Sequence, residues 1–164
     1  MNLKEIFTLQ QNLDEQIAKR SDLNFASKPI QNRQICIALL VEWCELANEV
    51  SFFKYWKAQK HLDRSKALEE LADVLHFLTT LSYKTGVSAE INPYVVPSQQ
   101  LDDQFCAVSQ LITQTFSQLT KTNIHHLYEL VLGFAQLLNF SENEILEAYR
   151  QKNKINHQRI YDHY

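Results

Sequence analysis

Turn-forming residues are scarce in this chain, and that scarcity limits what it can fold into more than any other feature. The 164 residues include only 2 Gly and 3 Pro. β-sandwiches and β-barrels need many tight turns, which are rich in these two residue types. The same scarcity argues against the Gly-rich loops of P-loop and Rossmann nucleotide-binding sites. The sequence therefore predicts an all-α fold, a bundle of five to six long helices with few connections.

Hydrophobic periodicity divides the chain into six expected helices. They cover about 3–19, 29–60, 63–85, 98–120, 123–138 and 141–160. Gly86 is suited to end the third helix, and Ser141 with Glu144 forms an S-x-x-E capping box at the start of the last. The sequence contains no internal repeat and no linker long enough to divide domains. We therefore expect residues 1–164 to form a single domain.

Charge and cysteine usage narrow the classes of function. Sixteen basic and 19 acidic residues give a formal charge of -3, which gives no reason to expect binding to nucleic acid. No run approaches the roughly 18 apolar residues of a membrane span, and the charged N-terminal segment does not resemble a signal peptide. Cys36, Cys44 and Cys106 form no CxxC pair, so we interpret them as core thiols of a reduced, cytoplasmic protein.

Carboxylates on two consecutive expected helices are the most informative feature. Glu42, Glu45 and Glu49 stand at i, i+3 and i+7, so they share one helical face. They border the apolar stripe of that helix, although like charges at these spacings repel one another. Glu70 and Asp73 repeat the i, i+3 spacing on the next helix. If the two helices pack antiparallel, the acids of both helices converge.

Carboxylates that share a pocket need protons or cations to neutralise them. An all-oxygen ligand set favours a hard cation, Mg²⁺ or Mn²⁺, over Zn²⁺. A solvated helix face is the alternative, because a single E-x-x-E motif is common on exposed helices. Two such motifs bordering the core strengthen the case for a metal site, and the solvated face stays open beside it. A di-iron carboxylate bundle would need two Glu-x-x-His motifs, whereas only Asp73 and His76 come near to that pattern.

Basic, aromatic and amide side chains accompany the acids. Lys54, Trp56 and Lys57 belong to the segment FFKYWK, which follows the first group of acids. Regularly spaced polar residues mark the last expected helix: Lys152, Asn153, Asn156 and Arg159. Positive charges near a cation site suit a polyphosphate, and aromatic rings can stack a base. Gln10 and Asp14, one turn apart on the first expected helix, can read a base edge by hydrogen bonds.

Five motifs in order resemble those of the dimeric dUTPases, which belong to the all-α NTP pyrophosphatase superfamily together with the MazG-like enzymes. The motifs are F-x-L-Q-x-x-L-D (7–14), E-x-x-E-x-x-N-E (42–49), F-K-Y-W-K (53–57), E-x-x-D-x-x-H-F (70–77) and Y-x-x-K-N-x-x-N-x-x-R (149–159). In its motifs and its short length, the chain most resembles the members of this family from Gram-positive bacteria and their phages. The resemblance implies a MazG-like four-helix core, a homodimer, and Mg²⁺-dependent hydrolysis of dUTP to dUMP and pyrophosphate.

The resemblance also implies roles for single residues. Metal ligands would be Glu42, Glu45, Glu70 and Asp73, with Glu49 assisting an additional ion. Glu42 or Glu45 would also orient the attacking water. The remaining motif positions would bind the substrate: Gln10, Asp14 and Trp56 at the nucleoside, Lys54, Lys57, Lys152 and Arg159 at the phosphates, and Asn153 and Asn156 at the sugar and phosphate. His76 would bind the substrate as well.

Two other functions remain open at the level of sequence. A sister nucleoside triphosphate pyrophosphatase, acting on dCTP or a broader set, would share the metal site and differ in the base pocket. A non-catalytic helical protein-binding module would keep the fold without the reaction, and a phage-derived member could also bind a regulatory host protein. Acidic residues stand at every implied ligand position, which argues against an inactive site.

Overall fold

A computed structural model describes residues 1–23, 28–59 and 61–162 of the chain. These residues form six helices: α1 (Lys4–Ala18), α2 (Lys28–Val50), α3 (Arg64–Thr85), α4 (Leu101–Thr115), α5 (Lys121–Leu137) and α6 (Glu142–Tyr161). Within those ranges the only extended pairing is an isolated bridge between Asn2 and Glu90. The predicted all-α bundle is therefore confirmed. None of the described helices combines the length and the hydropathy of a membrane-spanning segment.

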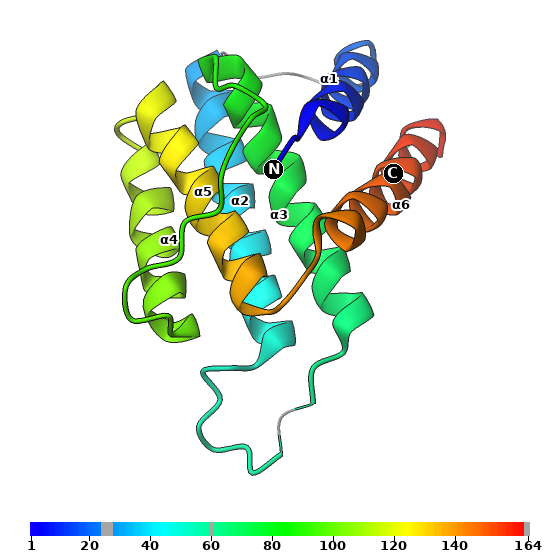
Figure 1. The fold of residues 1–164 in the computed structure, drawn as a ribbon. Helices are drawn as coiled ribbons and strands as arrows, with labels where there is room; N and C mark the ends of the chain where they lie inside the picture. The colour runs from blue at the N-terminus through cyan, green and yellow to red at the C-terminus, as the bar shows by residue number, and fades with distance from the viewer. Residues whose placement is uncertain (24–27, 60, 163–164) are drawn as a thin grey trace.

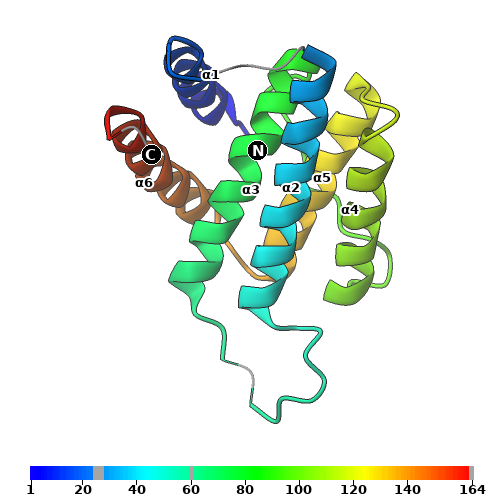
Figure 2. The ribbon, with the colours of Figure 1, turned by 180° about the vertical axis from the view of Figure 1, so that it is seen from behind.

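Helix α3 is central to the arrangement, because it contacts α1, α2, α5 and α6. Helices α1 and α6 lie side by side on one side of α3, whereas α2, α4 and α5 lie on the other (Figures 1 and 2). The chain runs down α2 and back up α3, so these two neighbours are antiparallel (Figure 1). This is the packing that the carboxylate motifs require if they are to converge.

Three helix ends are capped at the positions where the sequence predicts them. Asp63 caps α3, where its side chain accepts a hydrogen bond from the Lys66 backbone N–H. Gly86 ends α3 in the left-handed conformation, at a φ of 77°, where a residue without Cβ is not strained. Ser141 and Glu144 form the predicted capping box at the start of α6.

Helix α2 is shorter than its sequence predicts. It ends at Val50 instead of continuing to about residue 60, and Ser51 follows it with a positive φ of 60°. The FFKYWK segment consequently lies in the loop between α2 and α3 (Figure 1). Helix α4 is also shorter than predicted, at Leu101–Thr115, and α5 begins at Lys121 rather than Asn123 because Thr120 supplies its cap.

The core is built from the apolar stripes of α2 and α3, packed against α5. Trp43 of α2 is fully buried, stacks on Phe105 of α4 and meets Phe134 of α5 edge-on. The acids border this stripe, as their spacing predicts. The prediction that all three cysteines are core residues is wrong: Cys36 is buried, whereas Cys44 and Cys106 are exposed.

Candidate active site

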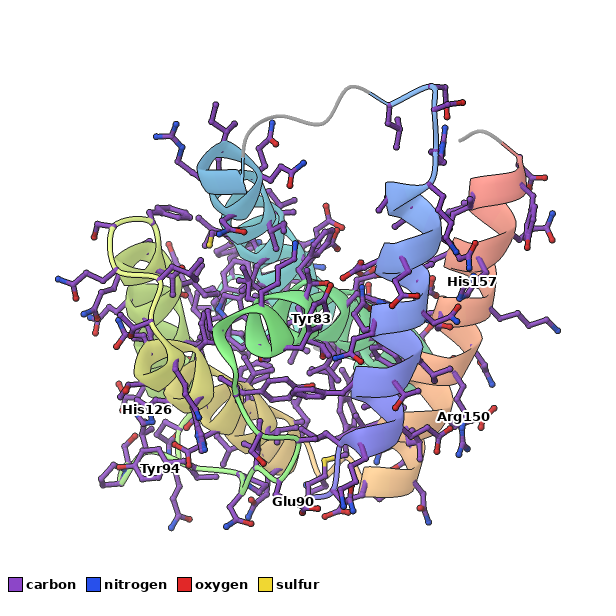
Figure 3. All side chains as sticks on the ribbon, turned by 90° about the horizontal axis from the view of Figure 1, so that it is seen from above. Tyr83, Glu90, Tyr94, His126, Arg150 and His157 are labelled. Carbon is purple, nitrogen blue, oxygen red and sulfur yellow. The ribbon has the colours of Figure 1, made fainter. Side chains whose placement is uncertain are left out.

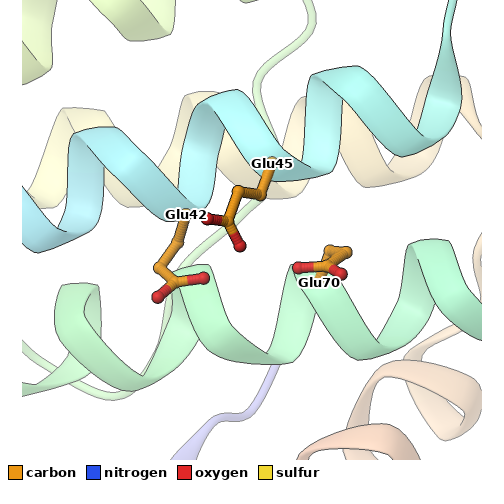
Figure 4. A group of neighbouring side chains, drawn as sticks. All are labelled: Glu42, Glu45 and Glu70. Atoms are coloured by element: carbon orange, nitrogen blue, oxygen red, sulfur yellow. The ribbon is translucent and has the colours of Figure 1, made fainter.

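Three carboxylates converge between α2 and α3. Glu42 and Glu45 of α2 and Glu70 of α3 each offer an oxygen, and these oxygens all lie within 4.8 Å of one another (Figure 4). The i, i+3 spacing places the two α2 residues on the face that meets α3. Antiparallel packing then brings Glu70 opposite them. The structure thus brings together three of the predicted metal ligands.

The cluster is short of positive charge. Burial raises the pKa of Glu42 to about 7, and the neighbouring carboxylates contribute in the same direction. Burial, and then the nearby carboxylates with Asp73 foremost, also raise the pKa of Glu70. A raised carboxylate pKa means that the site favours a bound proton or another cation over three uncompensated charges. An all-oxygen donor set of this kind fits a hard divalent cation.

Asp73 lies one turn after Glu70 and forms an ion pair with a lysine from α6. Its Oδ2 is 2.6 Å from Lys152 Nζ, which also donates to Glu69 Oε1 at 2.9 Å. Burial raises the pKa of Asp73 and outweighs the opposing effect of Lys152. The pKa of Lys152 is raised because, although burial opposes its charge, its two carboxylate partners together prevail. The predicted fourth ligand is thus beside the cluster and is paired with a predicted phosphate-binding residue.

A pocket of about 840 Å³ adjoins the cluster, with a size typical of small-molecule sites. Its walls come from α1, α2, α3 and α6, and include apolar side chains such as Leu13, Ile35 and Phe77. Seven residues singled out from the sequence line it: Gln10, Asp14, Glu42, Asp73, His76, Asn156 and Arg159. Glu42 and Asp73 join the pocket to the acidic cluster. The geometry is therefore an apolar chamber with one strongly acidic end.

Helices α1 and α6 form one side of this pocket and face α3. Viewed from above, they lie together beside α3, with Tyr83 on α3 and His157 on α6 (Figure 3). The Asn153 side chain ties the two helices by donating to the Leu9 carbonyl at 3.5 Å. Arg159 donates to Asn156 Oδ1 at 3.2 Å, so both polar groups of α6 lie at the same pocket wall.

A hydrogen-bond network holds Gln10 at the base of the pocket. The Gln10 side chain contacts Asp14, Thr80, His76 and Tyr149. Sequence reasoning assigned no role to Thr80, Tyr83 or Tyr149. Thr80 and Tyr83 follow His76 at i+4 and i+7 on α3, so the helical face that begins with the E-x-x-D motif could have indicated them. Their bonds to Asp14, at 2.6 Å each, depend on the packing of α1 against α3.

Six predicted site residues neither line this pocket nor belong to the three-carboxylate group: Lys152 and Asn153, whose contacts are given above, and Glu49, Lys54, Trp56 and Lys57. Lys54 Nζ donates to the Asn48 carbonyl at 2.8 Å and lies over the Phe53 ring. Trp56 is 62% exposed and Lys57 is exposed as well. These three belong to the loop after α2. Glu49 is half-buried on α2, one turn beyond Glu45, and is not part of the three-carboxylate group.

A comparison with known protein families identifies the family of this chain. A family model described as dUTPase matches residues 2–164, which is almost the whole chain. The chain belongs to the dUTPase family. As a dUTPase it hydrolyses dUTP to dUMP, and membership implies a requirement for a divalent metal in general. The resemblance drawn from the five motifs is thereby confirmed. No individually curated protein matches the chain at a significant level.

Proposed function

We propose that this dUTPase uses Mg²⁺ and hydrolyses dUTP by attack of water on the α-phosphorus, releasing pyrophosphate. The observation that carries the proposal is the juxtaposition of three carboxylates with the 840 Å³ pocket. The acidic end suits a cation and the apolar chamber suits a base. Mn²⁺ has the same preference for oxygen ligands and would substitute for Mg²⁺.

Glu42, Glu45 and Glu70 would hold the ion, and Asp73 would join them on release from Lys152. Glu49, one turn beyond Glu45 on α2, would assist an additional ion. A divalent cation held by these residues would supply a bound water of lowered pKa and positive charge beside the departing pyrophosphate. Glu42 is the member of the three-carboxylate group that also lines the pocket, so we assign it the orientation of the attacking water. Glu45 supports it from the next turn of α2.

The substrate would enter with its base between α1 and α3 and its phosphates toward the acids. Lys152 and Arg159 on α6 supply positive charge for the phosphates, while Asn153 and Asn156 contact the sugar and the first phosphate. Gln10, Asp14 and His76 shape the base end. Roles for Lys54, Trp56 and Lys57 require the loop after α2 to approach the pocket when the nucleotide binds.

The assembly is proposed to be a homodimer of this single domain, residues 1–164, working in the cytoplasm. Three aliphatic residues on one face of α2, Ile30, Ile37 and Val41, are exposed, and such a stripe favours association. All three cysteines, which lie in described segments, are free thiols. That state fits a reducing compartment. Light scattering of the active protein tests the dimer, and a fully active monomer would exclude it.

The experiment that tests the function is pyrophosphate release from dUTP, dCTP, dTTP and UTP, each with and without Mg²⁺. We expect fast, Mg²⁺-dependent turnover of dUTP alone. Turnover of dCTP or of the whole panel would keep the metal chemistry and reject the base selectivity. Activity that persists in EDTA would reject the metal site itself.

A further inference from the structure

In the hydrogen-bond network around Gln10, each donor and each acceptor is determined by its neighbours. The same reasoning extends to the ring nitrogens of His76. We infer that Asp14, Thr80 and Tyr83 are positioning residues that fix one tautomer of His76 and leave its buried Nε2 as a bare acceptor, which a hydrogen-bond donor of the nucleoside reaches when the side chains around it shift. The inference deepens the proposed function and rests on it, since the nucleoside must occupy this pocket.

The direction begins at Asp14, because a carboxylate offers only acceptors. Its Oδ2 accepts from Thr80 Oγ1 and from the Tyr83 hydroxyl, both at 2.6 Å. Its Oδ1 accepts from Gln10 Nε2 at 2.9 Å. Thr80 has given its single hydroxyl proton to Asp14, so its oxygen accepts the second N–H of Gln10, at 3.0 Å.

This arrangement sets the orientation of the Gln10 amide. Both of its N–H donors face Asp14 and Thr80, so its oxygen must face the other way. That oxygen lies 2.6 Å from His76 Nδ1 and 2.5 Å from the Tyr149 hydroxyl. An amide oxygen only accepts, so the His76 Nδ1 atom must carry a proton.

His76 itself carries a single ring proton. Burial lowers the pKa of His76 to about 3, and the nearby Lys152 and His157 act in the same direction. The proton on Nδ1 therefore leaves Nε2 with a bare lone pair. The ring lines the pocket, is 4% exposed, and stacks on Tyr149 at a centroid distance of 4.3 Å.

The Nε2 atom is the one place where this network ends without a partner. It is buried, and no described residue forms a hydrogen bond with it. Buried acceptors without partners are rare and unfavourable, so a ligand that brings a donor to this atom is favoured over one that does not. A deoxyuridine nucleotide has two such donors, the imide N–H of uracil and the sugar hydroxyl. Cytosine has a ring acceptor where uracil has the imide N–H, so an imide contact would also discriminate against dCTP.

The tautomer can be measured directly by ¹⁵N NMR of the histidine ring in the free protein at neutral pH. We expect a protonated, pyrrole-like Nδ1 and an unprotonated, pyridine-like Nε2 for His76. The reverse pattern, or two protonated nitrogens, would overturn the inference. This measurement needs neither metal nor turnover, so its failure is distinguishable from failure of the proposed function.

The role of Asp14 is tested by Asp14→Asn. The amide nitrogen of the new side chain would face Gln10 Nε2, so the Gln10 amide turns and the His76 proton moves, wholly or in part, to Nε2. We also expect KM for dUTP to rise several-fold with a smaller change in kcat. Glu15→Gln is the matched control, because it removes the same charge from the next, exposed position of α1. An unchanged tautomer in Asp14→Asn would show that Asp14 does not position His76.

The donor is identified by binding the product nucleotide. Saturating dUMP should shift the His76 Nε2 resonance, and 2′,3′-dideoxyuridine monophosphate, which lacks the sugar hydroxyl, separates the two donors. A retained shift assigns the contact to the imide N–H, and a lost shift assigns it to the hydroxyl. If bound dUMP leaves the Nε2 resonance unchanged, Nε2 is not the acceptor and the inference fails.

Discussion

Two buried glutamines on opposite sides of α3 both use every hydrogen-bonding group of their amides, but with different kinds of partner. Gln104 of α4 accepts from the Val96 N–H and donates to the carbonyls of Tyr94 and Leu130, so its whole amide holds the chain before α4 against α5. Gln10 of α1 also uses its whole amide, but its partners are side chains that line the pocket or lie beside it. One amide stabilises the fold and the other orients a site.

The two sides of α3 also differ in whether their buried polar groups and charges have partners. The α4–α5 side packs Trp43, Phe105 and Phe134 in close aromatic contact, and its buried Gln104 is satisfied within the protein. The side facing α1 and α6 contains carboxylates with raised pKa values and the unpartnered His76 Nε2. Unfavourable groups that persist in a folded protein commonly mark its functional site. Substitutions on the two sides should therefore separate stability from activity.

The largest effect is expected from Glu45→Gln in the acidic cluster. The variant should lose turnover by about a thousandfold or more, equivalent to about 4 kcal/mol in the activation free energy. Its metal-free stability should be unchanged or higher, because one of the repelling charges is gone. Pyrophosphate release measures the activity, and melting in EDTA and in Mg²⁺ measures the stability. Glu129→Gln, on α5, is the charge-matched control. Normal turnover in Glu45→Gln would remove it from the site.

Gly133→Ala on α5 is expected to lower stability and leave activity unchanged, the reverse of Glu45→Gln. A Cβ at this position would lie 1.9 Å from the Tyr94 carbonyl oxygen, which is main chain and cannot rotate away. The segment before α4 must move and loosen its bonds to Gln104, so we expect a loss of about 3 kcal/mol or more. Urea unfolding measures the loss, and activity per folded molecule should be retained. Gly86→Ala is the control: its φ is 77° with nothing within 4 Å, so only the backbone penalty of about 1–2 kcal/mol applies.

The same comparison explains what could be predicted from the sequence. Helix positions and the Ser141 capping box follow from residue spacing, because periodicity and capping are local. The convergence of Glu42 with Glu70 needs in addition the antiparallel packing of α2 and α3 (Figure 1). The end of α2 at Val50 was missed because nothing in the apolar pattern signals the positive φ of Ser51.

The supporting part of the site was missed for a different reason. The Thr80 and Tyr83 hydroxyls bond to a carboxylate more than sixty residues away in the chain. Threonine and tyrosine on a helix have many ordinary roles, and only the packing of α1 on α3 selects this one. Spacing therefore identifies Gln10 and Asp14 and places Thr80 and Tyr83 on the helical face of His76, whereas only the packing of α1 on α3 shows that these two hydroxyls bond to Asp14.

Lowering the pH should lower the free energy of unfolding, because His76 beside the pocket resists protonation in the folded protein. The folded-state pKa of His76 is lowered to about 3, so between pH 6.5 and pH 3 the unfolded chain binds more protons and stability falls as pH falls. Between pH 8 and pH 5 this contribution is about 2 kcal/mol. Urea unfolding in EDTA at the two pH values should show a smaller change in His76→Gln than in the parent protein. Equal changes in both would mean that His76 is not held neutral.

The smallest effect is expected at the exposed capping box that begins α6. Bonds from Arg64 and then from Ser141 lower the pKa of Glu144 to about 2. Because the folded-state pKa is depressed, this stabilisation is present above about pH 4.5 and is lost as pH falls toward 2. Glu144→Gln should therefore melt slightly below the parent protein at pH 7 and converge with it in acid. Salt should narrow the difference at pH 7, since the pair with Arg64 is exposed. A constant difference from pH 7 to pH 3 would mean that the capping geometry, not the charge of Glu144, stabilises this helix end.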